Sequence, residues 1–233
     1  MICILLTGGG TGGHIYPLIA VARELRDVAD INNILLNVVY CGSYGEYKKA
    51  LLAEDIKVVK IAGGKFRNYS SILNYLDIFR VAYSFFEAWI KIFFLMPDII
   101  YSTGGPGAFP VVFMGRFYRI PVFVQEPNAV PGRTNLASAK MAIRVGIAFS
   151  GAAQYFKKNN VALVGNPLRN ELFKNIPNLD SAKATLGFSP VMPVLLVLGG
   201  SQGSTRINDF IFANLDFLIA RFQILHQVGD ENY

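Results

Sequence analysis

The chain has 233 residues, 52% of them hydrophobic, and this composition excludes an intrinsically disordered protein. Only 16% of the residues are charged, and the formal net charge of +6 favours an anionic partner: a nucleic acid, an anionic lipid or a phosphorylated substrate. Cys3 and Cys41 fall in predicted core strands without disulfide or CxxC spacing, which is typical of buried thiols in a reducing compartment. Residue 1 leads directly into a strand, so we expect no secretory signal.

A glycine-rich loop follows the first predicted strand, residues 2–6, and a helix is expected to begin near Pro17. Glycines and a helix N-terminus offer close backbone approach and unpaired N–H groups, which favour a phosphate or diphosphate. The glycines also match the dinucleotide spacing GxGxxG. However, the second strand, residues 34–40, is not followed by the acidic residue that would hold a ribose. The sequence therefore disfavours a nucleotide-dependent dehydrogenase.

Strands and helices alternate beyond this loop, which predicts an α/β protein with a doubly wound parallel sheet. The expected strands are residues 56–61, 98–102, 120–124 and 145–148, and the expected helices are residues 44–54, 72–96, a segment ending near 117, and 134–142. Residues 151–160 are expected to form a connector or short helix with a basic end.

The most hydrophobic stretch, residues 72–96, is predicted to be one helix. Charged residues interrupt it, so it lacks the roughly 20 continuous apolar residues of a transmembrane span. Its polar residues recur with helical spacing and share one face: Asp77, Arg80, Ser84, Glu87 and Lys91. The ordinary interpretation is a helix sandwiched between the sheet and its neighbours. The alternative is that its aromatic residues, with the preceding Lys65 and Arg67, contact an anionic membrane surface.

The strand expected at residues 98–102 runs into a second glycine turn followed by a helix. Its glycines are Gly104, Gly105 and Gly107. Two such turns at the carboxyl ends of parallel strands line the crevice where open α/β sheets bind ligands. The next strand delivers Glu126 and Asn128 to the same edge, so these polar groups lie where chemistry is expected.

We place a domain boundary between residues 163 and 164, because the following segment is polar and rich in Asn, Pro and Lys. In residues 164–233 we expect a helix over 180–186 capped by Asp180 or Ser181, a strand over 194–198, a glycine loop over 199–204, a helix from about Ile207 and a strand over 224–227. Two strands cannot close a doubly wound sheet, so this second domain is expected to be incomplete.

The chain resembles the MurG family of glycosyltransferases, glycosyltransferase family 28, in four motifs that stand in the family's order. The motifs are Gly9–His14 with Pro17, Glu126–Asn135, Gly165–Arg169 and Leu198–Gly203. The resemblance implies a GT-B fold of two Rossmann-like doubly wound domains: an acceptor and membrane-side domain, residues 1–163, and a truncated UDP-sugar-binding domain, residues 164–233. It also implies inverting transfer of N-acetylglucosamine from its UDP donor to the 4-hydroxyl of undecaprenyl-pyrophosphoryl-N-acetylmuramoyl-pentapeptide, converting lipid I to lipid II in bacterial cell-wall synthesis.

Binding residues are also implied by the resemblance. Those expected to contact UDP-N-acetylglucosamine are Thr11, Gly12, Gly13, Asn128, Arg169, Ser201, Gln202 and Gly203. Those expected to surround the acceptor diphosphate are Gly10, Gly104, Gly105 and Gly107. Backbone N–H groups of residues 201–203 could cradle the donor diphosphate, and Arg169 could add a bidentate charge.

Inverting transfer needs a base near the acceptor hydroxyl and positive potential at the leaving diphosphate. His14 and Glu126 are the candidate bases. For each, a structural role stays open: His14 as a helix cap or as filler of the cleft floor, and Glu126 as a carboxylate bonded to backbone amides. We expect no cofactor and no metal, because no His, Cys or Asp cluster has ligand spacing. His226 is expected to pack within a strand.

The implied partners are UDP-N-acetylglucosamine, lipid I and the anionic bacterial inner membrane, with the protein peripheral at the cytoplasmic face. Nucleic acid is the least expected partner because the basic residues are scattered. Two alternatives stay open: another GT-B transferase or sugar-nucleotide epimerase, and a non-catalytic lipid- or partner-binding fragment. The sequence departs from the family pattern on the acceptor side, at Pro106, Gln125 and Pro127.

Overall fold

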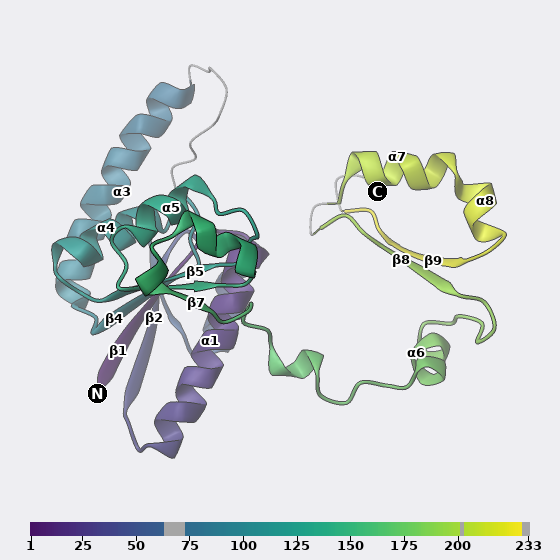
Figure 1. The fold of residues 1–233 in the computed structure, drawn as a ribbon, viewed down its shortest axis with the longest axis horizontal. Coiled ribbons are helices and arrows are strands. Elements are labelled where there is room, and N and C mark those ends of the chain that lie inside the picture. The colour runs from purple at the N-terminus through teal and green to yellow at the C-terminus, as the bar shows by residue number, and fades with distance from the viewer. Residues whose placement is uncertain (63–72, 201–202, 230–233) are drawn as a thin grey trace. The chain divides into compact units, whose positions relative to one another are not determined.

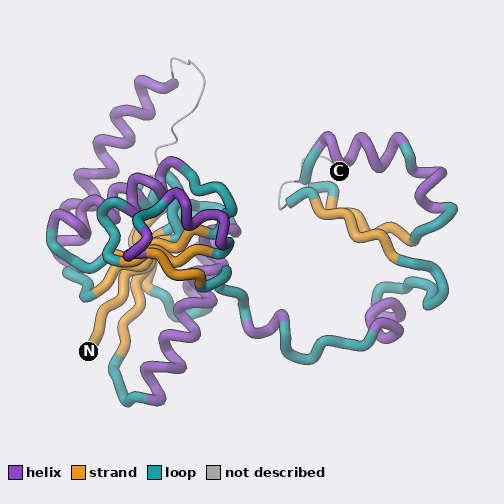
Figure 2. Tube along the Cα trace, in the orientation of Figure 1, coloured by secondary structure: helices purple, strands orange, loops and turns teal. Residues whose placement is uncertain are grey.

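A computed structural model describes residues 1–62, 73–200 and 203–229 of the chain. The chain divides into two compact units, residues 1–170 and 171–233 (Figures 1 and 2). The first unit extends to Asn170, beyond the boundary expected at residue 163.

The first unit is built on a seven-stranded sheet of order β3-β2-β1-β4-β5-β6-β7, with all neighbouring strands parallel. The strands are β1 (Ile2–Thr7), β2 (Leu36–Gly42), β3 (Lys57–Lys60), β4 (Ile99–Ser102), β5 (Val122–Glu126), β6 (Arg144–Ile147) and β7 (Val161–Leu163). Because the strand order reverses between β1 and β4, the ligand crevice of such a sheet lies at the carboxyl ends of these two strands.

Helices cover both faces of this sheet, which confirms the predicted doubly wound α/β class. They are α1 (Gly12–Ile31), α2 (Lys48–Ala53), α3 (Leu73–Leu95), α4 (Phe109–Phe117) and α5 (Arg133–Ala139), with 3-10 turns η1 (Gly45–Tyr47), η2 (Ser150–Tyr155) and η3 (Lys158–Asn160). Side chains of successive strand residues alternate between the faces. Leu6 packs with Leu18 beneath α1, whereas Leu5 packs beneath α3 and α4 on the opposite face. Cys41 is fully buried as expected, but Cys3 is partly exposed.

Helix α1 begins at Gly12 rather than near Pro17. Thr11 is extended at the N-cap, and its carbonyl accepts the N–H groups of His14 and Ile15 at 3.0 and 3.1 Å. Pro17 lies in the second turn, where it lacks the N–H that would pair with the carbonyl of Gly13. The glycines therefore form the first helical turn themselves, and their N–H groups belong to the unpaired set at the helix N-terminus.

Strand β7 was not expected from the sequence. Its three residues, too few to show a hydrophobic period, form an edge strand that pairs only with β6 in the part of the chain that the structure describes. The segment after it stays attached to the first unit. Gln125 Nε2 donates to the carbonyl of Gly165 at 2.7 Å, and Asn170 Nδ2 donates to Glu24 Oε1 at 2.7 Å. These contacts explain why the first unit extends beyond residue 163.

Helix α3 packs against the sheet with its polar stripe. Ser84, Ala88 and Ile92 are buried on one side of the helix. The aromatic side chains on the rest of its surface are 45% to 80% exposed: Phe79, Tyr83, Phe86, Trp89, Phe93 and Phe94. The interpretation of a helix sandwiched between the sheet and its neighbours is therefore wrong for the described part of α3. A single sheet face and α4 bury only a narrow stripe of this helix, and Glu87 and Lys91 have backbone partners at the end of β3.

Lys65 and Arg67 lie outside the described residues, as does the side chain of Asp77. Among the described residues, no helix combines the length and apolar character needed to cross a membrane.

In its described part, the second unit holds the parallel strands β8 (Val194–Leu198) and β9 (Gln223–Gln227) with three helices. The helices are α6 (Leu179–Thr185), α7 (Thr205–Ala213) and α8 (Leu215–Ile219). The cap of α6 is Asn178, whose Oδ1 accepts the N–H of Ser181 at 2.8 Å, so the caps expected at Asp180 or Ser181 are wrong. His226 packs against the ring of Phe212, as expected.

Substituting Gly115 should test how tightly α4 packs on the sheet. A Cβ at Gly115 would overlap Ile100 Cδ1 and lie 3.3 Å from Val122 Cγ2. We expect Gly115→Ala to lower the free energy of unfolding by about 1–3 kcal/mol through overpacking. Gly151→Ala is the matched control, because no atom of the described residues lies within 4 Å of a Cβ there. Urea unfolding measures both variants, and equal stabilities would contradict the described packing.

Candidate functional site

Three loops meet at the carboxyl edge of the sheet, after β1, β2 and β4. A Cβ on Gly105 would lie 2.9 Å from the backbone of Gly9, so the first and third loops are in backbone contact. A Cβ on Gly107 would lie 2.8 Å from Ser43 Oγ, and one on Gly10 would lie 3.2 Å from the same atom. The absence of side chains on these glycines therefore allows the loops to close into one cradle at the switch point of the sheet.

His14 stands between the first and third loops. Its Nδ1 lies 3.0 Å from the carbonyl oxygen of Thr103, and Thr103 Oγ1 donates to the carbonyl of His14 at 3.1 Å. Because a carbonyl oxygen only accepts, Nδ1 carries the proton and Nε2 is the basic atom of the ring. Nε2 lies 3.3 Å from the Cβ position of Gly105.

Burial is the main cause that lowers the pKa of the His14 imidazole below 6.5. The bond to the Thr103 carbonyl and the charge of Glu126 act in the opposite direction. A neutral ring held by one nitrogen, with the other directed to the cradle, has the properties of a general base.

Glu126 ends β5 and is fully buried. Its Oε1 accepts the backbone N–H and the Nδ2 group of Asn128 at 2.9 and 3.0 Å, and its Oε2 accepts Nδ2 of Asn135 at 2.9 Å. Both oxygens are thus engaged by N–H donors. This geometry favours the structural role that the sequence left open for Glu126.

Asn135 on α5 is a residue to which the sequence assigned no role. Besides Glu126, its Nδ2 contacts the carbonyl of Gln125 at 3.2 Å. Its Oδ1 is buried and has no hydrogen-bond partner among the described residues. A Cβ at Gly104, whose φ is +84°, would overlap this oxygen. Asn135 therefore connects Glu126 to the third loop, but its position within the second motif was the sole signal for it.

Several residues predicted to bind the donor gather at the amino end of α1. Thr11 is exposed, and its side chain makes no capping hydrogen bond within the described residues. No described atom lies within 4 Å of a Cβ at Gly13, and a Cβ at Gly12 would lie 3.4 Å from the ring of Tyr16. The guanidinium of Arg169 lies over that ring, with Cζ 4.4 Å from its centroid. Asn128 is also exposed, beside Glu126.

The glycine loop of the second unit is described only in part, since Ser201 and Gln202 lie outside the described residues. Gly203 has φ +74°, and its N–H donates to the carbonyl of Gly200 at 3.0 Å. A Cβ at Gly203 would overlap the carbonyl oxygen of Val228. The N–H expected to help cradle a diphosphate is thus used within the turn, and glycine is required here for steric reasons.

Among the described residues, no three His, Cys, Asp or Glu side chains are grouped as metal ligands.

Residues 4–147 match the sequence model of the glycosyltransferase family 28 N-terminal domain. The chain belongs to glycosyltransferase family 28. This family 28 chain is 36% identical over 231 residues to UDP-N-acetylglucosamine--N-acetylmuramyl-(pentapeptide) pyrophosphoryl-undecaprenol N-acetylglucosamine transferase 3 of Bacillus thuringiensis. It is also 34% identical over 230 residues to the UDP-N-acetylglucosamine--N-acetylmuramyl-(pentapeptide) pyrophosphoryl-undecaprenol N-acetylglucosamine transferase of Clostridium botulinum. Each match covers 98% of this chain, and the chain spans 63% of the length of these relatives.

Solved structures share the fold of the family 28 chain. MurG of Acinetobacter baumannii has a TM-score of 0.65 at 23% identity, with 99% of this chain and 60% of that chain covered. UDP-GlcNAc 2-epimerase of Neisseria meningitidis, bound to UDP-GlcNAc, has a TM-score of 0.65 at 11% identity, with 99% and 66% covered. At these identities the likeness concerns the fold alone, and it confirms the predicted GT-B type of α/β fold.

The protonation of His14 gives a direct check of the site. Because its folded-state pKa is lowered, NMR titration of the imidazole C–H signals should give a midpoint below 6.5. The unfolded state then binds the proton more readily, so this group lowers the free energy of unfolding as pH falls from 6.5 through the folded-state pKa. A His226→Gln variant assigns the signals. A midpoint at or above 6.5 would contradict the described environment.

Proposed function

We propose that the family 28 protein is an inverting transferase that moves N-acetylglucosamine from UDP-N-acetylglucosamine to the 4-hydroxyl of undecaprenyl-pyrophosphoryl-N-acetylmuramoyl-pentapeptide. The observation that carries this proposal is the neutral His14 between two glycine loops at the switch point of the sheet. The names of the relatives support the donor and the acceptor class. The chain spans 63% of the length of these relatives, so the proposed activity is that of a whole protein. In that protein, His14 and the glycine loops would bind and activate the acceptor.

In the proposed reaction, Nε2 of His14 takes the proton of the acceptor hydroxyl. The hydroxyl oxygen bonds to the anomeric carbon of the donor sugar as the bond from that carbon to the diphosphate oxygen breaks, and UDP leaves with the electron pair. The negative charge of the buried Glu126 stabilises the imidazolium that forms. The same attraction raises the pKa of His14. The glycine loops and the first-turn N–H groups of α1 would bind a diphosphate.

We further propose that the protein binds peripherally to the anionic cytoplasmic face of a bacterial membrane. The exposed aromatic residues of α3, with the exposed Phe113 and Phe117 of α4, support an apolar contact surface. Arg116 and Arg119 are exposed beside it, and the net charge is +6.

Trp89, the only tryptophan of the sequence, reports on this surface. Anionic vesicles that leave its emission unchanged would contradict the proposal.

Two other functions can be distinguished from this one by separate experiments. A non-catalytic lipid-binding role is favoured by the same exposed aromatic residues and predicts vesicle binding without any effect of nucleotide. A different sugar-nucleotide enzyme would share the glycine loops. Competition among UDP-sugars separates that possibility from N-acetylglucosamine transfer.

Replacing His14 should remove most of the proposed activity. Transfer of labelled N-acetylglucosamine to a lipid I acceptor would be measured for the chain alone and for the chain joined to the remaining part of the Bacillus thuringiensis relative. We expect His14→Gln to lower kcat by about 10²–10⁴-fold, which is the usual contribution of a general base. His226→Gln is the matched control and should keep the rate. The proposal fails if neither protein transfers the sugar, or if His14→Gln retains the full rate.

A further inference from the structure

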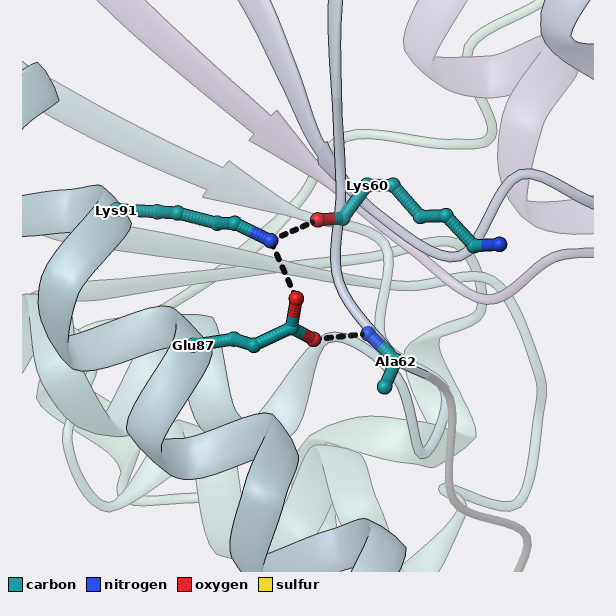
Figure 3. Close-up of polar contacts among 4 residues, drawn as sticks. All are labelled: Lys60, Ala62, Glu87 and Lys91. Carbon is teal, nitrogen blue, oxygen red and sulfur yellow. Dashed lines mark hydrogen bonds and ion pairs between the residues drawn. The ribbon is translucent and has the colours of Figure 1, made fainter.

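Two charged residues of α3 bind the backbone at the end of β3 (Figure 3). Glu87 Oε2 accepts the N–H of Ala62 at 2.6 Å, and Glu87 Oε1 lies 2.6 Å from Lys91 Nζ. The same Nζ donates to the carbonyl of Lys60 at 2.5 Å. We call Glu87, Lys91 and these two backbone groups the α3 clamp.

The position of β3 explains why this clamp forms. Within the described parts of the chain, β3 is an edge strand that pairs only with β2, and the N–H of Ile61 continues that pairing to the carbonyl of Gly42 at 3.1 Å. Backbone groups of successive residues in an extended strand point to opposite sides. The carbonyl of Lys60 and the N–H of Ala62, on either side of Ile61, therefore point away from β2. Backbone groups on an open sheet edge need other partners. Glu87 and Lys91 supply an acceptor and a donor to these groups.

The clamp holds one side of α3 at the end of β3. Glu87 and Lys91 are one helical turn apart and share a side of the helix. Trp89 and Phe93 each follow one of them by two residues, which turns them about 200° around the helix axis. An amphipathic helix ordinarily buries its wider apolar face. In α3 the polar side is bound instead, and the aromatic side is exposed.

We propose that Glu87 and Lys91 are positioning residues that fix the rotation of α3 and thereby hold its aromatic face toward an anionic lipid surface. This inference rests on the membrane binding proposed above. Tyr118, which directly follows α4, supports the same orientation, because its hydroxyl donates to the carbonyl of Trp89 at 3.2 Å and its ring lies 6.2 Å from that of Phe93.

The chain offers a matched control for the ion pair. Arg23 and Glu54 also lie 2.6 Å apart, with side chains 32% and 20% exposed, against 30% and 17% for Lys91 and Glu87. The Arg23–Glu54 pair joins α1 to the end of α2, on the opposite face of the sheet from α3. Glu54→Gln therefore removes an equivalent charge without affecting the clamp.

The test compares Glu87→Gln, Lys91→Met and Glu54→Gln with the unchanged protein. Each is titrated with vesicles of phosphatidylglycerol and phosphatidylcholine, some brominated in the acyl chains, while Trp89 emission is followed. We expect the unchanged protein and Glu54→Gln to bind and be quenched alike. Glu87→Gln and Lys91→Met should bind about twofold to fivefold more weakly, as expected for loss of a partly exposed pair, and should show less quenching by brominated lipid at saturation.

Thermal unfolding and acrylamide quenching of Trp89 without lipid complete the comparison. A merely structural role would lower the unfolding midpoint of Glu87→Gln and Glu54→Gln alike and leave lipid quenching unchanged. An unchanged protein that does not respond to vesicles overturns both the membrane proposal and this one. Normal vesicle binding and quenching by both clamp variants overturns this inference alone.

Discussion

The buried carboxylate of Glu126 is the interaction on which the candidate site depends. A buried charge is tolerated only where hydrogen bonds replace its hydration. Here the donors come from Asn128, just beyond β5, and from Asn135 on α5. The carboxylate therefore joins the end of a strand, the loop after it and the next helix. Asn135 in turn lies against Gly104, so the position of the third loop follows from the same group.

This arrangement separates the two candidate bases by environment. Glu126 has its oxygens engaged by N–H groups, whereas His14 is held through Nδ1 alone and keeps Nε2 as its basic atom. The charge of Glu126 raises the pKa of His14, while burial lowers it more. A fixed carboxylate near a neutral imidazole suits a site in which the imidazole accepts a proton and the carboxylate stabilises the charge produced.

Local patterns predicted much of the fold. β8 has the predicted bounds because Pro193 and Gly199 enclose an uninterrupted apolar run. The start of α1 could not be predicted in this way, since Pro17 suggested a first turn and the structure tolerates it in the second. For α3, periodicity placed Glu87 and Lys91 on one side of the helix but could not say what that side contacts. Their contacts with the backbone at the end of β3 are a tertiary feature.

Parts of the candidate site could likewise be predicted from the sequence, and other parts could not. The meeting of the glycine loops could be predicted from the sequence, because loops after parallel strands meet at one edge. His14 was a candidate through its place in the family motif and the need for a base. The inward orientation of Asn135 and the use of the Gly203 N–H within its turn depend on packing between segments distant in sequence. A single sequence contains no direct signal for either.

The most direct measurement is the free energy of unfolding of Glu126→Gln, compared with Asp27→Asn at an exposed position of α1. The side-chain NH2 group of glutamine would replace one acceptor oxygen and face an N–H donor of Asn128 or Asn135, so at least one buried hydrogen bond would be lost. The account predicts a loss of about 1–3 kcal/mol for Glu126→Gln, and a change within about 0.5 kcal/mol for the exposed control. Equal stability of Glu126→Gln and the unchanged protein would contradict the organising role of this carboxylate.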